Sequence, residues 1–305
     1  MHAIELLVGY PMFRDALITG AAVGIVCSLL SVIVVLKRLA FIGQGISHAG
    51  FGGVGTAVLL GVAPGVPQDL LVLLFCVGAA ILIGALSRRR AVEVDSAIGI
   101  LLVAAMAWGV LATDLSAALG QYAWYVQLVG PPQARPGFEA LLFGSLLSVG
   151  SGQMLMALAL CATVIVAFIA TLKEILFYTF DETSSRVFGV RTTVVHYLLL
   201  GLLSLTIVIS IRLVGFVLVS ALLVLPGATA NLLTRRLRWA FALSLAVGMI
   251  GTVGGLLVSL EVGNLSSGPC IVVVLCIIFV VGYAARFGLF RRWGGSEGPE
   301  LVERA

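Results

Sequence analysis

The segment LAFIGQGISHAGFGGVGTAVLLGV, residues 39–62, decides the fold, because it has the length of a membrane-spanning helix and carries polar side chains inside it. A helix would place Gln44, Ser47 and His48 on one face, since residues three and four apart return to the same side. Polar groups are costly within a bilayer, and they indicate a functional face there by default. Seven glycines in the segment allow neighbouring helices to approach its backbone closely. These residues predict a transmembrane helix with a functional polar face.

The whole chain has the composition of a multi-pass membrane protein. Of its 305 residues, 61% are hydrophobic and 10% are charged, and the mean hydropathy is +1.18, whereas soluble domains carry about 25% charged residues. The net charge of +4 rests on arginines at the ends of apolar segments, which favours orientation in a bilayer over binding of nucleic acid. The five cysteines lie inside apolar runs without a CxxC pair, so we expect small buried side chains rather than disulfides or a zinc site.

About nine segments are apolar and long enough to span a bilayer as helices, and a count of eight to ten is compatible with the sequence. They are residues 13–36, 39–62, 70–86, 96–113, 153–172, 192–211, 213–233, 237–260 and 266–287. A shorter apolar run at 138–149, within a proline-rich connection, predicts an interfacial or re-entrant helix. We therefore predict an all-α, polytopic helix bundle that forms a single membrane domain over residues 1–305.

Basic residues fall mainly on one side of these predicted spans. That side receives Lys37, Arg38, Arg88, Arg89, Arg90, Lys173, Arg186, Arg191, Arg235, Arg236, Arg238, Arg286, Arg291 and Arg292. The opposite side receives Arg14, Arg135 and Arg212. Because cytoplasmic loops carry the excess of Lys and Arg, we expect the N-terminus outside the cell and the C-terminus in the cytoplasm.

The cytoplasmic connection at 174–191 carries a helix pattern of its own. Either Asp181 or Thr179 can cap the start of a short helix, and Glu182 suits its positive N-terminal end. Gly189 is placed to end the helix in a left-handed turn. The pattern predicts a short amphipathic helix across the cytoplasmic face.

Two interpretations of this predicted helix remain open. It is either a solvated loop helix without a partner or a docking element for a soluble protein. Phe180 and Phe188 would be exposed on an isolated loop, and exposed apolar groups beside charges indicate an interface. The docking interpretation is the sharper of the two.

Pro226 and Gly227 interrupt the apolar run at 213–233. Proline removes a backbone hydrogen bond, so a kink or a break in the helix is expected there. Such interruptions are tolerated at membrane depth where they face protein or a water-filled cavity. A structural kink and a direct role in a transport pathway remain equally open.

The common catalytic signatures are absent from the sequence. Neither Lys37 nor Lys173 lies in a GxxxxGK[ST] loop, and the chain has no HExxH and no GxSxG motif. His48 is the one histidine deep in an apolar stretch; counted from Leu39 at about 1.5 Å per residue, it lies roughly 13 Å along the helix. That position is close to the bilayer midplane, where transport sites lie, although a structural, hydrogen-bonded histidine is the alternative.

Four blocks of the sequence resemble a known family. They are KRLAFIGQGISHAGFGG at 37–53, DSAIGIL at 95–101, FDETSSRVFGV at 180–190 and VGFVLVSALLVLPGATANLLTRR at 214–236. In this order they are similar to the permease subunits of ABC importers for zinc, manganese and ferrous iron. The resemblance covers nearly the whole chain.

The resemblance implies a type II importer permease in the cytoplasmic membrane of a bacterium, surrounded by lipid. Two permease copies, identical or closely paralogous, would form the pathway, and separate ATPase subunits would dock below and hydrolyse ATP. An extracytoplasmic metal-binding protein would deliver the ion, and this chain would hold no cofactor of its own. The residues matching the family's coupling helix, which docks on the ATPase, are Asp181, Glu182, Arg186 and Gly189.

The resemblance also implies a metal path along this helix, with His48 as a transient ligand. Gln44 and Ser47, on the same predicted face, would line the path beside it. The sequence departs from the family pattern here, because Gln44 stands at the usual aspartate position and Gly52 at the usual proline. A neutral carbonyl and an imidazole form a weaker site for a divalent ion than a carboxylate and an imidazole. Two alternatives therefore stay open: a permease for a metal chelate such as a siderophore, haem or corrinoid, and an ATPase-independent secondary transporter.

Overall fold

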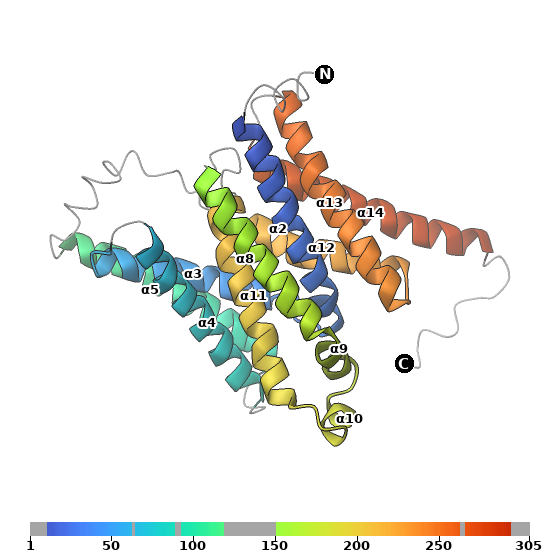
Figure 1. Ribbon diagram of the computed structural model, residues 1–305, viewed down its shortest axis with the longest axis horizontal. Coiled ribbons are helices and arrows are strands. Elements are labelled where there is room, and N and C mark those ends of the chain that lie inside the picture. The colour runs from blue at the N-terminus through green and yellow to red at the C-terminus, as the bar shows by residue number, and fades with distance from the viewer. Residues whose placement is uncertain (1–10, 63–64, 89–92, 119–150, 263–265, 294–305) are drawn as a thin grey trace.

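The computed structural model describes residues 11–62, 65–88, 93–118, 151–262 and 266–293, and within these ranges the chain is helical apart from short turns (Figure 1). The helices are α2 (Pro11–Leu36), α3 (Ile42–Leu59), α4 (Val66–Arg88), α5 (Val94–Ala118), α8 (Ser151–Ala170), α9 (Leu172–Phe180), α10 (Glu182–Val187), α11 (Thr192–Val214), α12 (Phe216–Leu233), α13 (Leu237–Val262) and α14 (Ser267–Trp293). The predicted all-α class is confirmed, and the described residues contain no strand.

Each of the nine predicted spans coincides with a helix in the described part of the chain. Six of these helices, α2, α4, α5, α11, α13 and α14, are long and apolar enough to cross a membrane. The pair α8 and α9 passes the same test as one span bent by 62°. Helices α3 and α12, of 18 residues each, occupy the two remaining positions but do not pass this test. Six spans, or seven with the bent pair, are therefore supported by length and composition among the described residues. The shorter run predicted at 138–149 lies outside the described residues.

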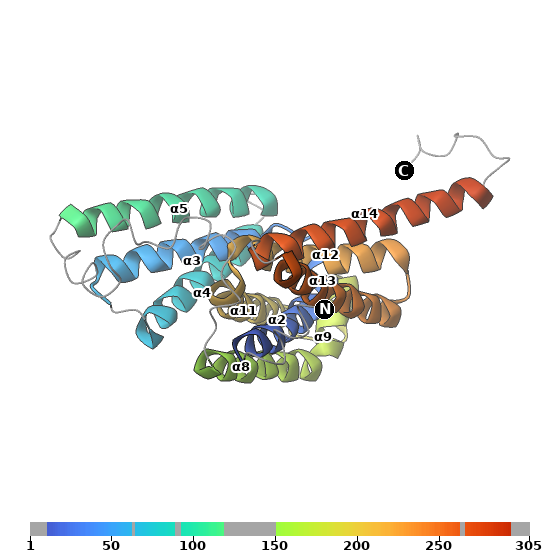
Figure 2. The same cartoon turned by 90° about the horizontal axis from the view of Figure 1, so that it is seen from above.

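Helix α2 lies at the centre of the bundle. It contacts α8, α11, α12 and α13. In its apolar stretch 67% of the residues are buried, compared with 22% in that of α14. Figure 2 shows α5 and α14 along one side of the molecule and α8 along the opposite side. Hydroxyl groups hold the centre together, because Ser244 of α13 donates a hydrogen bond of 2.7 Å to the carbonyl of Ser28 in α2.

The structure keeps α12 helical through Pro226, so of the kink or break expected from the sequence the break does not occur. The N–H of Gly227 donates to the hydroxyl of Ser31 in α2 at 2.8 Å, and both Pro226 and Gly227 are buried. A Cβ atom at Gly227 would overlap the backbone of Ser31. The proline and glycine therefore form a close helix–helix contact, in which a neighbouring side chain satisfies backbone groups near the proline.

Glycines bring α3 into backbone contact with helices on two sides. A Cβ at Gly53 would lie 2.8 Å from the Cα of Val72 in α4, and one at Gly55 would overlap the backbone of Gly109 in α5. In a bilayer, helices associate by close van der Waals packing rather than by the hydrophobic effect, and small residues permit that packing. The glycines of the predicted polar helix therefore fix its place between α4 and α5.

We predict that Gly55→Ala lowers the stability of the protein. The added methyl group meets backbone that cannot rotate away, and overpacking of this kind costs about 1–3 kcal/mol. Gly99→Ala on α5 is the matched control, because nothing lies within 4 Å of a Cβ at that position. Thermal unfolding of the detergent-solubilised variants should give a lower midpoint for Gly55→Ala alone; equal midpoints for the two variants would contradict the packing argument.

Candidate functional site

The polar face of α3 is narrower than the sequence predicts. Gln44 is exposed and His48, one turn later, is half-buried, so these two side chains share an open side of the helix. Ser47 is fully buried, and its hydroxyl donates to the carbonyl of Gln44 at 2.9 Å. The structure therefore brings Gln44 and His48 together and turns Ser47 into the protein interior, which corrects the expectation of three polar groups on one face.

His48 also lies nearer to the start of its helix than the sequence predicts. Helix α3 begins at Ile42 rather than Leu39, so His48 is about 9 Å along it at about 1.5 Å per residue. The residues between the two helices, from Lys37 to Phe41, form the turn that joins α2 to α3. The imidazole is therefore close to this turn, on the second turn of α3.

A single chain offers few metal ligands at this position. Gln44 supplies an amide oxygen and His48 an imidazole nitrogen. Among the described residues, no group of three or more His, Cys, Asp or Glu side chains could hold a metal ion. The pair thus offers one oxygen and one nitrogen as candidate ligands on the open side of α3.

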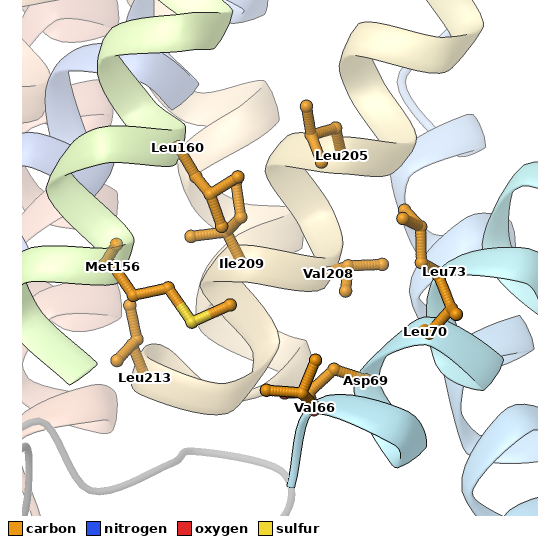
Figure 3. Close-up of a pocket in the computed structure, with 11 residues that line it drawn as sticks. Val66, Asp69, Leu70, Leu73, Met156, Leu160, Leu205, Val208, Ile209 and Leu213 are labelled. Carbon is orange, nitrogen blue, oxygen red and sulfur yellow. The ribbon is translucent and has the colours of Figure 1, made fainter. Parts of the chain in front are cut away.

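An apolar cavity lies away from this face. It has a volume of about 260 Å³ and is lined by the first turns of α4, the first half of α8 and the second half of α11 (Figure 3). Asp69 is the one charged residue in its lining, and no residue of α3 takes part. Its apolar surface is unsuited to a divalent ion, so the open side of α3 remains the candidate metal path.

Asp181, one of the two caps that the sequence allows, caps α10 in the structure. Its carboxylate accepts hydrogen bonds from the N–H groups of Thr183 at 2.9 Å and Ser184 at 3.0 Å, and a further one from the Ser184 hydroxyl. The hydroxyl of Ser184, followed by these backbone groups, lowers the pKa of the Asp181 carboxyl. The alternative cap, Thr179, instead donates to the carbonyl of Ile175 within α9 at 2.6 Å. The carboxylate therefore stays charged and holds the start of α10.

Charged contacts and a glycine fix the rest of α10. Arg186 pairs with Glu182 at 2.6 Å, one turn apart, and its Nε donates to the hydroxyl of Thr192 at the start of α11 at 3.1 Å. Gly189 has a φ of +84°, so it supplies the left-handed turn predicted after the helix. All four predicted residues of the coupling segment thus shape one short, preorganised helix.

Apolar side chains surround this helix on its outer surface. Phe180, Val187 and Phe188 are 65%, 81% and 76% exposed, and the ring centroid of Phe188 lies 5.7 Å from that of Phe177. An exposed apolar patch beside a charged helix is typical of a protein–protein interface. The exposure expected for Phe180 and Phe188 is therefore present in the structure.

Sequence reasoning missed a cluster of three side chains between the end of α2, helix α9 and the start of α11. The Nζ of Lys37 lies 3.6 Å from the ring centroid of Tyr178, whose hydroxyl is 2.9 Å from Nδ1 of His196. The three residues are far apart in the chain, and only the fold brings them together. The one sequence signal was the presence of a lysine, a tyrosine and a histidine at the ends of apolar segments.

The model of one transport family, described as ABC 3, matches residues 9–286 of the chain. The chain belongs to the ABC 3 transport family. This membership confirms the family resemblance carried by the four sequence blocks. It favours an ABC permease over an ATPase-independent secondary transporter.

The similarity to other proteins covers nearly the whole length of this ABC 3 chain. The manganese transport system membrane protein MntC of Halalkalibacterium halodurans is 31% identical over 307 residues, covering 97% of this chain and 96% of that protein. The chelated iron transport system membrane protein YfeD of Yersinia pestis is 29% identical over 272 residues, covering 89% and 84%. A solved structure of PsaBC from Streptococcus pneumoniae in complex with Fab superimposes with a TM-score of 0.75 at 27% identity, covering 92% of this chain and 94% of that one.

We predict that Asp181→Ala loosens α10 in this ABC 3 permease. The substitution leaves the N–H groups of Thr183 and Ser184 without their acceptor, so the amides of 182–188 should exchange hydrogen for deuterium faster. Thr179→Ala is the control, because Thr179 takes no part in the cap. Hydrogen–deuterium exchange of the protein in nanodiscs measures the difference, and equal protection of α10 in both variants would refute the capping role.

Proposed function

We propose that this chain is the membrane-spanning subunit of a bacterial ABC importer that moves divalent transition-metal ions into the cytoplasm. The similarity to MntC and YfeD over nearly the full chain supports this proposal most directly, since those proteins are described as manganese and chelated iron transport membrane proteins. ATP is hydrolysed in a separate ATPase chain, and the energy reaches this subunit through protein contacts.

The metal path runs along the open side of α3. Gln44 and His48 face outward from the single chain, and together they provide too few ligands to retain an ion. A second copy, identical or closely paralogous, that packs against this side supplies additional ligands. A pathway of neutral nitrogen and oxygen ligands suits a conduit, because an ion must leave each site as readily as it enters.

The ATPase docks on α10 and the apolar side chains around it. The charged pair of Glu182 and Arg186 orients the contact, and Phe180 and Phe188 supply its apolar area. This assignment puts α10 in the cytoplasm, as the distribution of basic residues requires. It puts the N-terminus outside, on the side from which a metal-binding protein delivers the ion.

We predict that His48→Ala reduces metal uptake without loss of assembly, because it removes the imidazole ligand from the path. Ser47→Ala is the matched control, since the Ser47 hydroxyl is buried and bonded to the backbone. The assay is uptake of Mn²⁺, Fe²⁺ and Zn²⁺ in competition, with a chelated form of each, into proteoliposomes that contain the chain and its ATPase. Uptake of all free ions at the wild-type rate in His48→Ala would exclude this role, and uptake of chelates alone would favour the chelate alternative.

A second prediction concerns ion selectivity. Gln44→Asp places a hard, anionic oxygen one turn before His48, and Mn²⁺ prefers such ligands. The KM for Mn²⁺ should therefore fall relative to that for Zn²⁺, whereas Gln44→Asn, which keeps the amide, should leave the ratio of the two KM values near that of wild type. If Gln44→Asp also leaves this ratio unchanged, Gln44 does not face the ion.

A further inference from the structure

Three segments of the chain meet at the buried ring of Tyr178 in α9. On one side the ammonium of Lys37, at the end of α2, lies 3.6 Å from the ring centroid. On the other side the Tyr178 hydroxyl is 2.9 Å from Nδ1 of His196, in the second turn of α11. Tyr178 is only 6% exposed, whereas Lys37 is half-buried. The positive charge of the ammonium is attracted to the face of the ring.

The charge of Glu182, on helix α10, also acts on the ammonium of Lys37. Burial lowers the pKa of the Lys37 ammonium, while the negative charge of Glu182 on α10 acts in the opposite direction and raises it. The favourable surroundings of the half-buried ammonium therefore come from α9 and α10 together. A shift of these two short helices changes the free energy of Lys37 directly.

The turn that contains Lys37 leads straight into the polar helix. Arg38 has a φ of +57°, and the N–H of Leu39 bonds the carbonyl of Val34 at 2.8 Å, which closes the end of α2 tightly. Left-handed backbone is unfavourable for a residue with a side chain. The turn is therefore a defined, hydrogen-bonded connection, and Gln44 follows it within the first turn of α3.

His196 anchors the opposite edge of the cluster. A Cβ atom at Gly84 of α4 would lie 3.0 Å from Nε2 of His196, so the imidazole is packed directly on the backbone of α4. Helix α4 in turn packs on α3. Tyr178 thus connects the coupling segment to α3 by two routes, one through the α2–α3 turn and one through α11 and α4.

We propose that Tyr178 is a positioning residue that transmits ATPase docking from α9 and α10 to the polar face of α3, with Lys37 as its contact on the α2–α3 turn and His196 as its anchor. This inference rests on the proposed docking of an ATPase on α10. It assigns to Tyr178, Lys37 and His196 a part in coupling, although none of them lies on the metal path or on the exposed docking surface.

The direct test follows the accessibility of α3. Gln44→Cys, in a Cys276→Ser background that removes the exposed cysteine, is labelled with a maleimide in proteoliposomes containing the ATPase, with and without ATP and vanadate. We expect the nucleotide state to change the labelling rate several-fold, and Tyr178→Leu or Lys37→Met to abolish this change. Lys37→Arg keeps a cation over the ring and should restore it. This readout does not depend on which ion is carried.

A second measurement separates transmission from folding. In proteoliposomes, Lys37→Met should retain ATPase co-purification, thermal stability and ATP hydrolysis, while the Mn²⁺ transported per ATP falls several-fold and recovers in Lys37→Arg. Tyr178→Phe keeps the ring and loses only the hydroxyl, so it provides a milder variant that folds. If Tyr178→Leu and Lys37→Met, with the complex assembled, keep the wild-type effect of nucleotide on the labelling rate, the proposed transmission through Tyr178 is wrong. Absence of Mn²⁺, Fe²⁺ and Zn²⁺ uptake in wild type, with the labelling response intact, would overturn the metal assignment alone.

Discussion

The close approach of backbones along α3 is the constraint on which the rest of the structure depends. A helix that carries an exposed amide and a half-buried imidazole has limited apolar surface with which to hold its place among other helices. Gly53 and Gly55 compensate by letting α4 and α5 come within van der Waals distance of its main chain. That packing leaves one side of α3 open, and the open side carries Gln44 and His48. The position of the candidate path is thus set by residues that have no side chain.

The remaining helices organise around this arrangement through α2 and α11. Helix α2 packs on α12 and α13, and α11 contacts α4 and α3 on one side and α2 and α8 on another. Serine hydroxyls and glycines recur at these crossings, as in the contacts of Ser31 with Gly227 and of Ser244 with Ser28. Hydrogen bonds between helices replace the hydrophobic driving force that is weak within lipid. The bundle is therefore held by short, directional contacts that resist sliding of one helix past another.

Local signals in the sequence were sufficient for the approximate positions of the nine apolar helices, and they reduced the cap of α10 to Asp181 or Thr179. Apolar length determines where a membrane helix forms, and a carboxylate at Asp181 can cap regardless of what lies nearby. The inward turn of Ser47, the unbroken path of α12 through Pro226 and the contact of Lys37 with Tyr178 could not be predicted. Each depends on whether a group finds a partner, in its own helix or on a distant segment. Sequence spacing contains no information about those partners.

The bend of 62° between α8 and α9 sets the direction in which a load from the proposed ATPase contact on α10 would reach the bundle. A push along α9 would reach α8 mainly as a sideways load, which favours rocking of the helices over a piston stroke. A piston stroke would drag charged helix ends such as Lys173 into hydrocarbon, at about 3 kcal/mol for each charge. Rocking would change the tilt of the helices and would move charges near the pivot little in depth. With this bend, less work would therefore be spent on moving charged side chains out of water.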